Sequence, residues 1–183
     1  LFLFLALGFI VATAAGTLSH EGGHYIAARI MGYDGQIHYG SISYSDRRPA
    51  PEIERIAQTY RREIISGQDY PGKEQYDSYQ AKFDKSLFWM TLGGPLQTML
   101  FGTAGLLALF RNRKKYTQAV RLSFGRWLLI FLSLFWLRQP ANCAVWLISG
   151  FCSGHFSTHG DEIRLALNLG LPQGLFTIGT ALA

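Results

Sequence analysis

Residues 16–32 of the 183-residue chain read GTLSHEGGHYIAARIMG and place two histidines and a glutamate within five positions of an otherwise apolar segment. A polar group buried without a partner costs about 1–3 kcal/mol. There are therefore two cases for His20, Glu21 and His24. Either they bind a ligand or a polar partner, or they lie in a polar environment. The character of the surrounding sequence helps to separate these two cases.

The whole chain is rich in apolar residues. Hydrophobic residues make up 49% and charged residues 16%, against roughly 25% charged in an average soluble domain. Three windows reach the roughly 20 apolar residues that a membrane span requires, and a fourth opens at Gly174; the windows are residues 1–18, 87–110 and 127–151. A signal peptide is the lesser alternative for the first window, which lacks a basic leader and a cleavage site. We expect an integral, multi-pass, all-α membrane protein of about four transmembrane helices, with the last segment, GLFTIGTALA, cut short.

The sequence between the first two windows changes character twice. Residues 35–44, GQIHYGSISY, alternate in polarity and predict a strand or hairpin. The polar stretch that follows carries Ile53, Ile56, Tyr60 and Ile64 at helical spacing, with Pro51 suited to a first turn. We expect a small extramembrane helical insert with a second short helix near residues 74–83, serving as a solvated cover or as a substrate gate. The expected units are residues 1–44, 45–86 and 87–183.

The net charge of +5 comes largely from one short stretch without acidic residues, which follows the second window. Its members are Arg111, Arg113, Lys114, Lys115, Arg121 and Arg126. This pattern is typical of a loop next to a membrane rather than of a nucleic-acid site. We expect the lipid bilayer as a partner and no nucleic acid.

His20, Glu21 and His24 form the pattern H-E-x-x-H. On a helix the two histidines lie one turn apart on one face, where two imidazoles can bind a single zinc ion, Zn²⁺. The glutamate is placed to take a proton from a metal-bound water and pass it to a leaving amine. Chance spacing of two packing histidines is the alternative, but ionisable groups within a span are rare and indicate function.

A catalytic zinc requires a third protein ligand. Counting the crossings puts the end of the first helix and residues 153–172, SGHFSTHGDEIRLALNLGLP, on the same side of the membrane. Asp161 is our choice, since it opens an apolar helical run there, although a first-turn acid of a helix is its structural alternative. Glu162, His159 and His155 compete with it.

Residues 138–142, RQPAN, interrupt the third window, where Pro140 weakens the helix. Arg138 requires an interior partner or a watery cavity. We expect it to pair with Asp161 or Glu162 or to stabilise the oxyanion formed during cleavage, with snorkelling or a structural pair as alternatives. Gln97 and Asn142 are candidates for supporting the metal ligands or the oxyanion.

These motifs resemble those of the site-2 protease family of intramembrane zinc metalloproteases. SHEGGHYIAARIMG is similar to the family's H-E-x-G-H-x-x-x-A-x-x-x-G signature, and GGPLQTML is similar to its G-P-x-x-N element with Gln97 in place of asparagine. DEIR keeps Asp161 and Arg164 of a D-G-G-R-like turn and replaces both glycines. The resemblance implies that Asp161 is the third zinc ligand and that the family's cleavage of transmembrane segments applies here. It also implies that residues 36–44 pair with the substrate.

The leading hypothesis is an intramembrane zinc metalloendopeptidase that hydrolyses membrane-embedded or membrane-adjacent peptide bonds. Glu21 is its general base, the metal ligands are His20, His24 and Asp161, and its partner is a membrane protein or peptide substrate. A non-catalytic membrane protein that binds a metal or a partner on the same scaffold is the alternative, and a transporter is a third. An intact Glu21 favours the protease, because metal binding alone does not require it. Orientation stays open, since the basic loop and the resemblance favour opposite sides for the cytoplasm.

Overall fold

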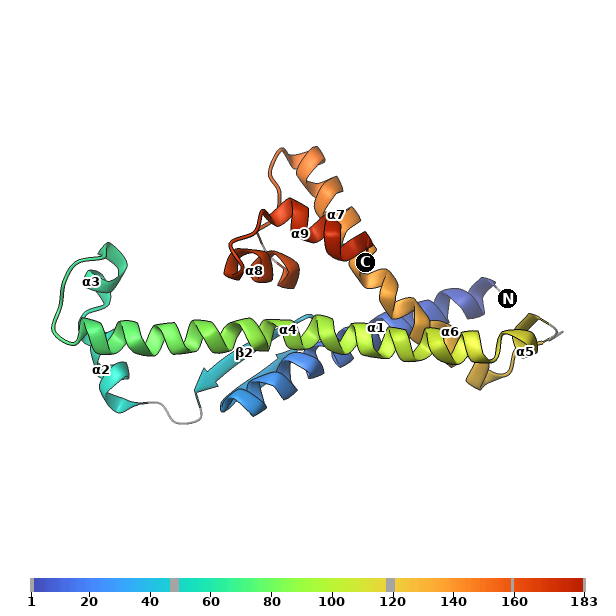
Figure 1. The fold of residues 1–183 in the computed structure, drawn as a ribbon, viewed down its shortest axis with the longest axis horizontal. Coiled ribbons are helices and arrows are strands. Elements are labelled where there is room, and N and C mark those ends of the chain that lie inside the picture. Colours follow the sequence, from blue (N-terminus) through green and yellow to red (C-terminus); the bar gives the residue numbers. More distant parts are fainter. Residues whose placement is uncertain (1, 47–49, 118–120, 159, 183) are drawn as a thin grey trace.

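The structure is a computed structural model that describes residues 2–46, 50–117, 121–158 and 160–182. The described chain is mostly helical, with a small antiparallel sheet, and is elongated along its longest helix (Figure 1). The elements are α1 (Phe2–Met31), β1 (Tyr33–His38), β2 (Ser41–Asp46), α2 (Pro51–Thr59), α3 (Arg61–Ser66), α4 (Lys73–Arg111), α5 (Arg113–Thr117), α6 (Phe124–Ser133), the 3-10 helix η1 (Leu134–Leu137), α7 (Arg138–Ser153), α8 (Asp161–Asn168) and α9 (Gln173–Leu182).

Within the described residues, three helical segments are long and apolar enough to cross a membrane: α1, α4 and the run from Phe124 to Ser153 that joins α6, η1 and α7. Most of their apolar side chains are exposed, which is rare over such an area on a soluble monomer. The prediction of a mostly helical chain with several long apolar helices is confirmed. The expected fourth segment is α9, which has 10 residues, fewer than the roughly 20 that a span requires.

α1 and α4 pack together most closely where two glycines meet. A Cβ on Gly23 would overlap the Gly93 carbonyl oxygen, and a Cβ on Gly93 would lie 2.5 Å from the Gly23 carbonyl oxygen. The two backbones therefore touch, as small residues allow in helix pairs. This crossing brings one face of α4 against the H-E-x-x-H turn of α1.

α4 is longer than the sequence pattern indicated. Residues 74–83, which we expected to form a separate short helix of the insert, belong to the first part of the 39-residue α4. The expected boundary between residues 86 and 87 therefore falls inside a continuous helix, because no glycine or proline occurs between Gly72 and Gly93 to end it. The helix expected after Pro51 is present and ends at Thr59, with Ile53 and Ile56 buried.

The third apolar segment loses regular α-helical geometry over η1, directly before the turn that contains Pro140. Proline cannot donate to the carbonyl four residues earlier, which here belongs to Trp136, and its ring crowds that carbonyl. The predicted weakening of this helix is confirmed, and it places Arg138 at the first position of α7.

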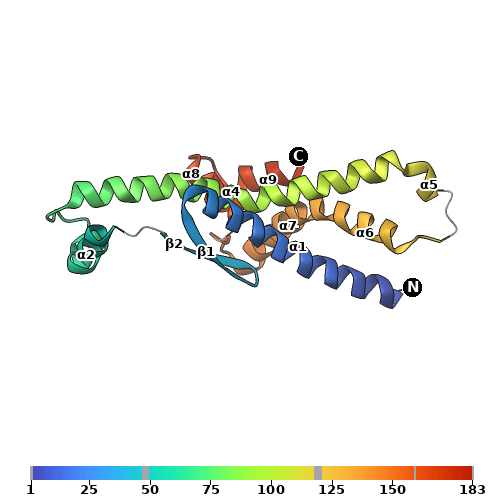
Figure 2. The ribbon, with the colours of Figure 1, turned by 90° about the horizontal axis from the view of Figure 1, so that it is seen from below.

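The expected hairpin spans residues 33–46, with Tyr33 opposite Asp46 and His38 opposite Ser41. Gly32, at φ +91°, ends α1 and reverses the chain, so the hairpin runs back beside α1 (Figure 2). β1 covers about 20 Å and the α1 segment from His20 to Met31 about 16 Å. The tip of the hairpin therefore comes level with His20.

Candidate metal site

The polar residues of the H-E-x-x-H motif are buried against α4. His20, Glu21 and His24 are each at most 4% exposed, and the two imidazole rings lie 4.8 Å apart between centroids on one face of α1. Helical spacing of four residues produces this arrangement.

A backbone carbonyl determines which nitrogen of His24 carries the proton. His24 Nδ1 lies 2.8 Å from the Met90 carbonyl oxygen, which can only accept, so Nδ1 donates. The Gly94 N–H lies 3.3 Å from the same Nδ1, but a protonated Nδ1 cannot accept it, and we assign the shorter contact. In the neutral ring, Nε2 of His24 is left as an acceptor, 3.2 Å from Asp161 Oδ2.

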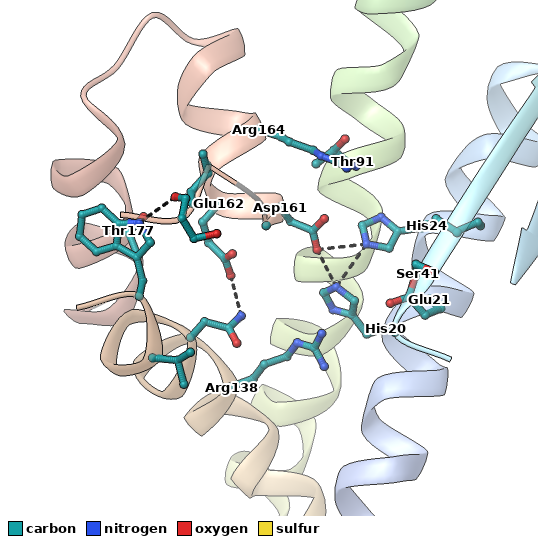
Figure 3. Close-up of a pocket in the computed structure, with 18 of the residues that line it drawn as sticks. His20, Glu21, His24, Ser41, Thr91, Arg138, Asp161, Glu162, Arg164 and Thr177 are labelled. Atoms are coloured by element: carbon teal, nitrogen blue, oxygen red, sulfur yellow. Dashed lines mark hydrogen bonds and ion pairs between the residues drawn. The ribbon is translucent and has the colours of Figure 1, made fainter. Parts of the chain in front are cut away.

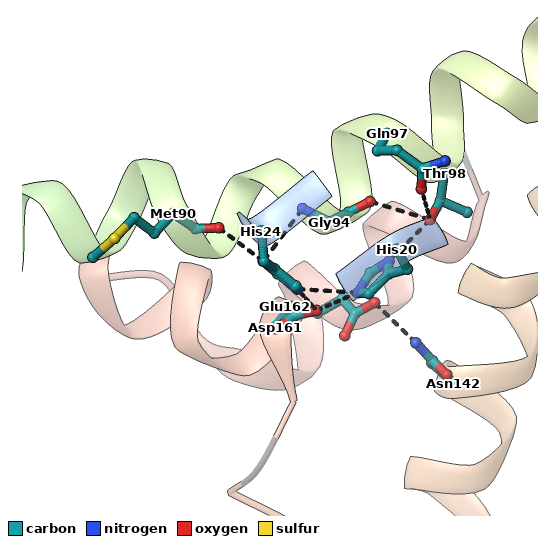
Figure 4. Close-up of polar contacts among 9 residues, drawn as sticks. All are labelled: His20, His24, Met90, Gly94, Gln97, Thr98, Asn142, Asp161 and Glu162. Atoms are coloured by element: carbon teal, nitrogen blue, oxygen red, sulfur yellow. Dashed lines mark hydrogen bonds and ion pairs between the residues drawn. The ribbon is translucent and has the colours of Figure 1, made fainter. Parts of the chain in front are cut away.

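Thr98 has the same effect on His20. The Thr98 hydroxyl donates to the Gly94 carbonyl oxygen at 3.1 Å, so its oxygen accepts from His20 Nδ1 at 2.9 Å. Figure 4 shows this chain of contacts behind the two rings. The Nε2 of His20 is then also an acceptor, as in histidines oriented for metal binding.

Asp161 completes a cluster of three acceptor atoms. As the first residue of α8, it places Oδ2 2.8 Å from His20 Nε2 and 3.2 Å from His24 Nε2, and the two Nε2 atoms are 3.2 Å apart (Figure 3). Ligands about 2.0–2.1 Å from a tetrahedral zinc lie about 3.3–3.4 Å from one another. The three residues could therefore hold a metal ion.

Three acceptors at these distances require a positive charge among them. A proton on one Nε2, which then donates to Asp161, supplies it, and so does a metal ion. Burial raises the pKa of the Asp161 carboxyl, but a proton on Nε2 of His20 or His24, hydrogen-bonded to Asp161, lowers that pKa by more, so it lies well below its usual range. Asp161 is consequently ionised at neutral pH.

The structure separates Asp161 from its competitors. Glu162 is buried, but its Oε1 accepts from Asn142 Nδ2 at 3.1 Å, and it is not part of the cluster. His155 is exposed and also lies outside the cluster. His159 lies outside the described residues. Of the candidates that are described, only Asp161 reaches both histidines.

Two of the residues expected to support the metal ligands or the oxyanion, Gln97 and Asn142, lie in different places. Gln97 donates to Ser19 and its Oε1 lies 3.4 Å from the Thr98 hydroxyl, so it lies behind the hydroxyl that holds His20. Asn142 contacts Glu162 rather than Asp161.

Arg138 lines the cavity beside the cluster, but among the described residues it forms no ion pair with Asp161 or Glu162. The expected direct pair with either carboxylate is wrong, because Asp161 Oδ2 is directed at the histidines and Glu162 Oε1 at Asn142 rather than at Arg138.

A cavity of about 460 Å³ opens over the cluster. Glu21 lines one side, next to residues of β2 that include Ser41, Ile42 and Tyr44, and α7 and α8 form the opposite side. Burial raises the pKa of the Tyr44 phenol, and the charges of Asp161 and Glu21 raise it further. Tyr44 therefore presents a neutral hydroxyl in this region.

Sequence reasoning missed the residues of α4 that hold the site. Met90, Gly94 and Thr98 repeat at intervals of four and so share one helix face. A Cβ on Gly94 would overlap the Nε2 atoms of both histidines. A glycine and a hydroxyl at i and i+4 on an apolar helix are the signal that could have identified this face.

Comparisons of the chain with known protein families, with curated proteins and with solved structures found no match.

Proposed function

We propose that this chain is a multi-pass membrane zinc metalloendopeptidase that hydrolyses peptide bonds of membrane-embedded or membrane-adjacent substrates. The observation that carries the proposal is the convergence of His20 Nε2, His24 Nε2 and Asp161 Oδ2 within 3.2 Å of one another, with Glu21 beside them. The sequence resemblance to the site-2 protease family points in the same direction.

The donor set fits zinc. Zinc accepts imidazole nitrogen and carboxylate oxygen, and its catalytic sites use three protein ligands and leave one position open. When bound, the ion would supply Lewis acidity that lowers the pKa of water and polarises a substrate carbonyl. Thr98 and the Met90 carbonyl keep the two imidazoles in the tautomer that such binding requires.

Glu21 has the remaining chemical role. It directly follows His20 on α1, is buried, and lines the cavity above the cluster. Its carboxylate accepts a proton from the attacking water and donates it to the leaving amine nitrogen. Metal binding by itself does not need a carboxylate at this position.

The peptide would lie along β2. β2 residues form one wall of the cavity, while β1 pairs with β2 on its other side. A strand with one edge toward a cavity can bind an extended peptide by backbone hydrogen bonds. This placement agrees with the role that the family resemblance implies for residues 36–44.

The depth of the site suits a membrane substrate. The histidines contact α4 at Met90 and Thr98, and the apolar part of α4 starts near Leu87. The contacts therefore lie about 5–17 Å into the apolar segment, from below the membrane surface to about the centre of a core about 30 Å thick.

The test uses the purified full chain with zinc and a transmembrane peptide. Wild type should retain about one zinc per chain and cleave the peptide. Glu21→Gln should retain the zinc and lose cleavage by about 10²-fold or more, whereas His24→Ala should lose the zinc as well. Glu74→Gln, at an exposed position of α4, is the matched control for loss of one carboxylate.

Two outcomes would overturn the proposal. A wild-type protein that holds zinc but cleaves no transmembrane peptide would instead be a non-catalytic metal-binding protein. Equal cleavage by wild type and Glu21→Gln would remove Glu21 from the chemistry.

A further inference from the structure

Arg138 is a charged residue near the middle of the third apolar segment. It lies about four helical turns from Phe124 and from Ser153, which is too deep for its side chain to reach either end of the segment. A cation at such depth requires an anionic partner or a polar cavity.

The two expected partners contact other residues. Asp161 contacts the two histidines and Glu162 accepts from Asn142. The Nε atom of Arg138 is buried and, among the described residues, has no hydrogen-bond partner. This Nε–H is thus a buried donor on the guanidinium group that no described group uses.

Arg138 stands at the boundary between two cavities. It lines the cavity over the metal cluster, and Figure 3 shows its side chain extending from α7 toward His20. It also lines a second, mainly apolar cavity of about 550 Å³ between α1 and the α6–α7 segment. The apolar side chains of that cavity include Phe9, Phe131, Leu134 and Phe135.

The charge of the site is compatible with an incoming anion. The cavity over the cluster is lined by three carboxylates, Glu21, Asp161 and Glu162, and by two guanidinium groups, Arg138 and Arg164. A bound divalent ion would leave this set with one positive charge in excess. A substrate carboxylate would neutralise that excess.

We propose that Arg138 binds a carboxylate of the peptide substrate, so that the protein selects membrane segments with an acidic group near the scissile bond and a large apolar side chain beside it. This proposal rests on the proposed function for its substrate and adds the substrate's class. The apolar side chain occupies the cavity lined by Phe131 and Phe135.

The energetics favour such a pair. An acidic residue at the centre of a membrane helix is costly to bury, and an unpaired arginine carries a similar penalty. Pairing them bidentately in a desolvated site relieves both. A glutamine at the same substrate position would leave Arg138 without its anion.

The experiment uses pairs of transmembrane peptides that differ only by a Glu or a Gln at one position. Each pair places this residue at a different position around the cleaved bond. At one position wild type should show a kcat/KM about tenfold or more higher for the Glu peptide. Arg138→Gln should reduce this ratio to about one, and Arg138→Lys should retain part of it. Arg111→Gln, an exposed arginine at the far end of α4, should keep the wild-type ratio.

A second arm identifies the source of the carboxylate. Peptides truncated at the preferred position are offered with a free C-terminal carboxylate or with a C-terminal amide. A preference confined to the free acid assigns the carboxylate to the end of the substrate chain, and a preference confined to Glu assigns it to a side chain.

Equal slowing of the Glu and Gln peptides by Arg138→Gln would overturn the proposal, because stabilisation of the oxyanion acts on every substrate alike. Binding of the same peptides to Glu21→Gln, followed by fluorescence anisotropy, separates this inference from the proposed function. A Glu preference in binding that disappears when Arg138→Gln is added supports recognition even if no peptide is cleaved. Equal binding of both peptides to Glu21→Gln would refute it.

Discussion

Each histidine of the cluster is oriented by a contact on the side away from Asp161. His24 Nδ1 donates to a backbone carbonyl that no side-chain substitution removes, whereas His20 Nδ1 donates to the Thr98 hydroxyl. The His20 side is therefore the one on which orientation can be changed by mutation. Loss of such a contact typically lowers metal affinity by about 10–100-fold.

Thr98→Val keeps the shape of the side chain and removes the acceptor. We expect zinc affinity, measured by competition with a chelator, to fall about 10–100-fold. Thr98→Ser, which restores a hydroxyl, should recover most of the affinity. Unchanged affinity in Thr98→Val would mean that Thr98 does not orient His20. Thr103→Val, on the same helix but outside the cluster, is the matched control.

Gly94 forms the floor of the cluster. Gly94→Ala would place a methyl group against the Nε2 atoms of His20 and His24, where the metal would be bound. We expect zinc content, measured by mass spectrometry on the folded protein, to fall below about one-tenth of wild type, because the ligand atoms cannot move apart without losing their shared geometry. Gly22→Ala is the control, since no atom of the described residues lies within 4 Å of its Cβ. Full zinc content in Gly94→Ala would contradict the proposed location of the metal.

Part of this site could be predicted from the sequence alone. Spacing alone placed His20 and His24 on one face, and the order of crossings favoured Asp161, which the structure does bring to both histidines. The identity of Thr98 and Gly94 as neighbours depends on the rotation of α4 about its axis, which tertiary packing decides. The expected direct Arg138 pair is wrong, because tertiary packing directs Glu162 at Asn142 and Asp161 at the histidines.

At the scale of elements, the site depends on how closely α1 and α4 approach. Gly23 and Gly93 allow contact between the two backbones, and neither carbonyl oxygen can give way as a flexible side chain can. A larger residue at either position would push the helices apart and draw Met90 and Thr98 away from the histidines.

Gly93→Ala should therefore lower the free energy of unfolding by about 1–3 kcal/mol, the usual penalty of overpacking. The change is measurable as a shift of the thermal unfolding midpoint in detergent. Gly125→Ala, in the first turn of α6 and without a described atom within 4 Å of its Cβ, should be neutral or slightly stabilising because alanine favours helix. Equal stability of Gly93→Ala and Gly125→Ala would indicate that the crossing is looser than described.

The elements were predictable to different degrees. Apolar windows and alternation predicted the long helices and the hairpin because these patterns are local. The continuity of α4 was missed, because a change from polar to apolar residues near Leu87 marks a change of environment and not a helix end. Residues 73–92 contain no glycine or proline that would favour a helix end near Leu87.

At the scale of the molecule, α4 is about 58 Å long, nearly twice the roughly 30 Å of a bilayer core. If its apolar part crosses the membrane, the polar first part projects into water together with α2 and α3. The basic α5 follows the other end of α4, and Figure 1 shows α3 and α5 at opposite ends of the molecule. The membrane proposal thus requires these two regions to face different compartments.

This requirement can be tested by cysteine labelling in a protein whose Cys143 and Cys152 have been replaced. Single cysteines are introduced at Ser66 or Thr117, both of which are exposed. In sealed vesicles of one orientation, a membrane-impermeant maleimide should label one of the two positions and reach the other only after detergent is added. A cysteine at Glu54, on α2, should behave like the one at Ser66, because the crossing by α4 separates both from Thr117. Labelling of Ser66→Cys and Thr117→Cys together in intact vesicles would show that α4 does not cross, and the cluster of His20, His24 and Asp161 would then lie outside a bilayer.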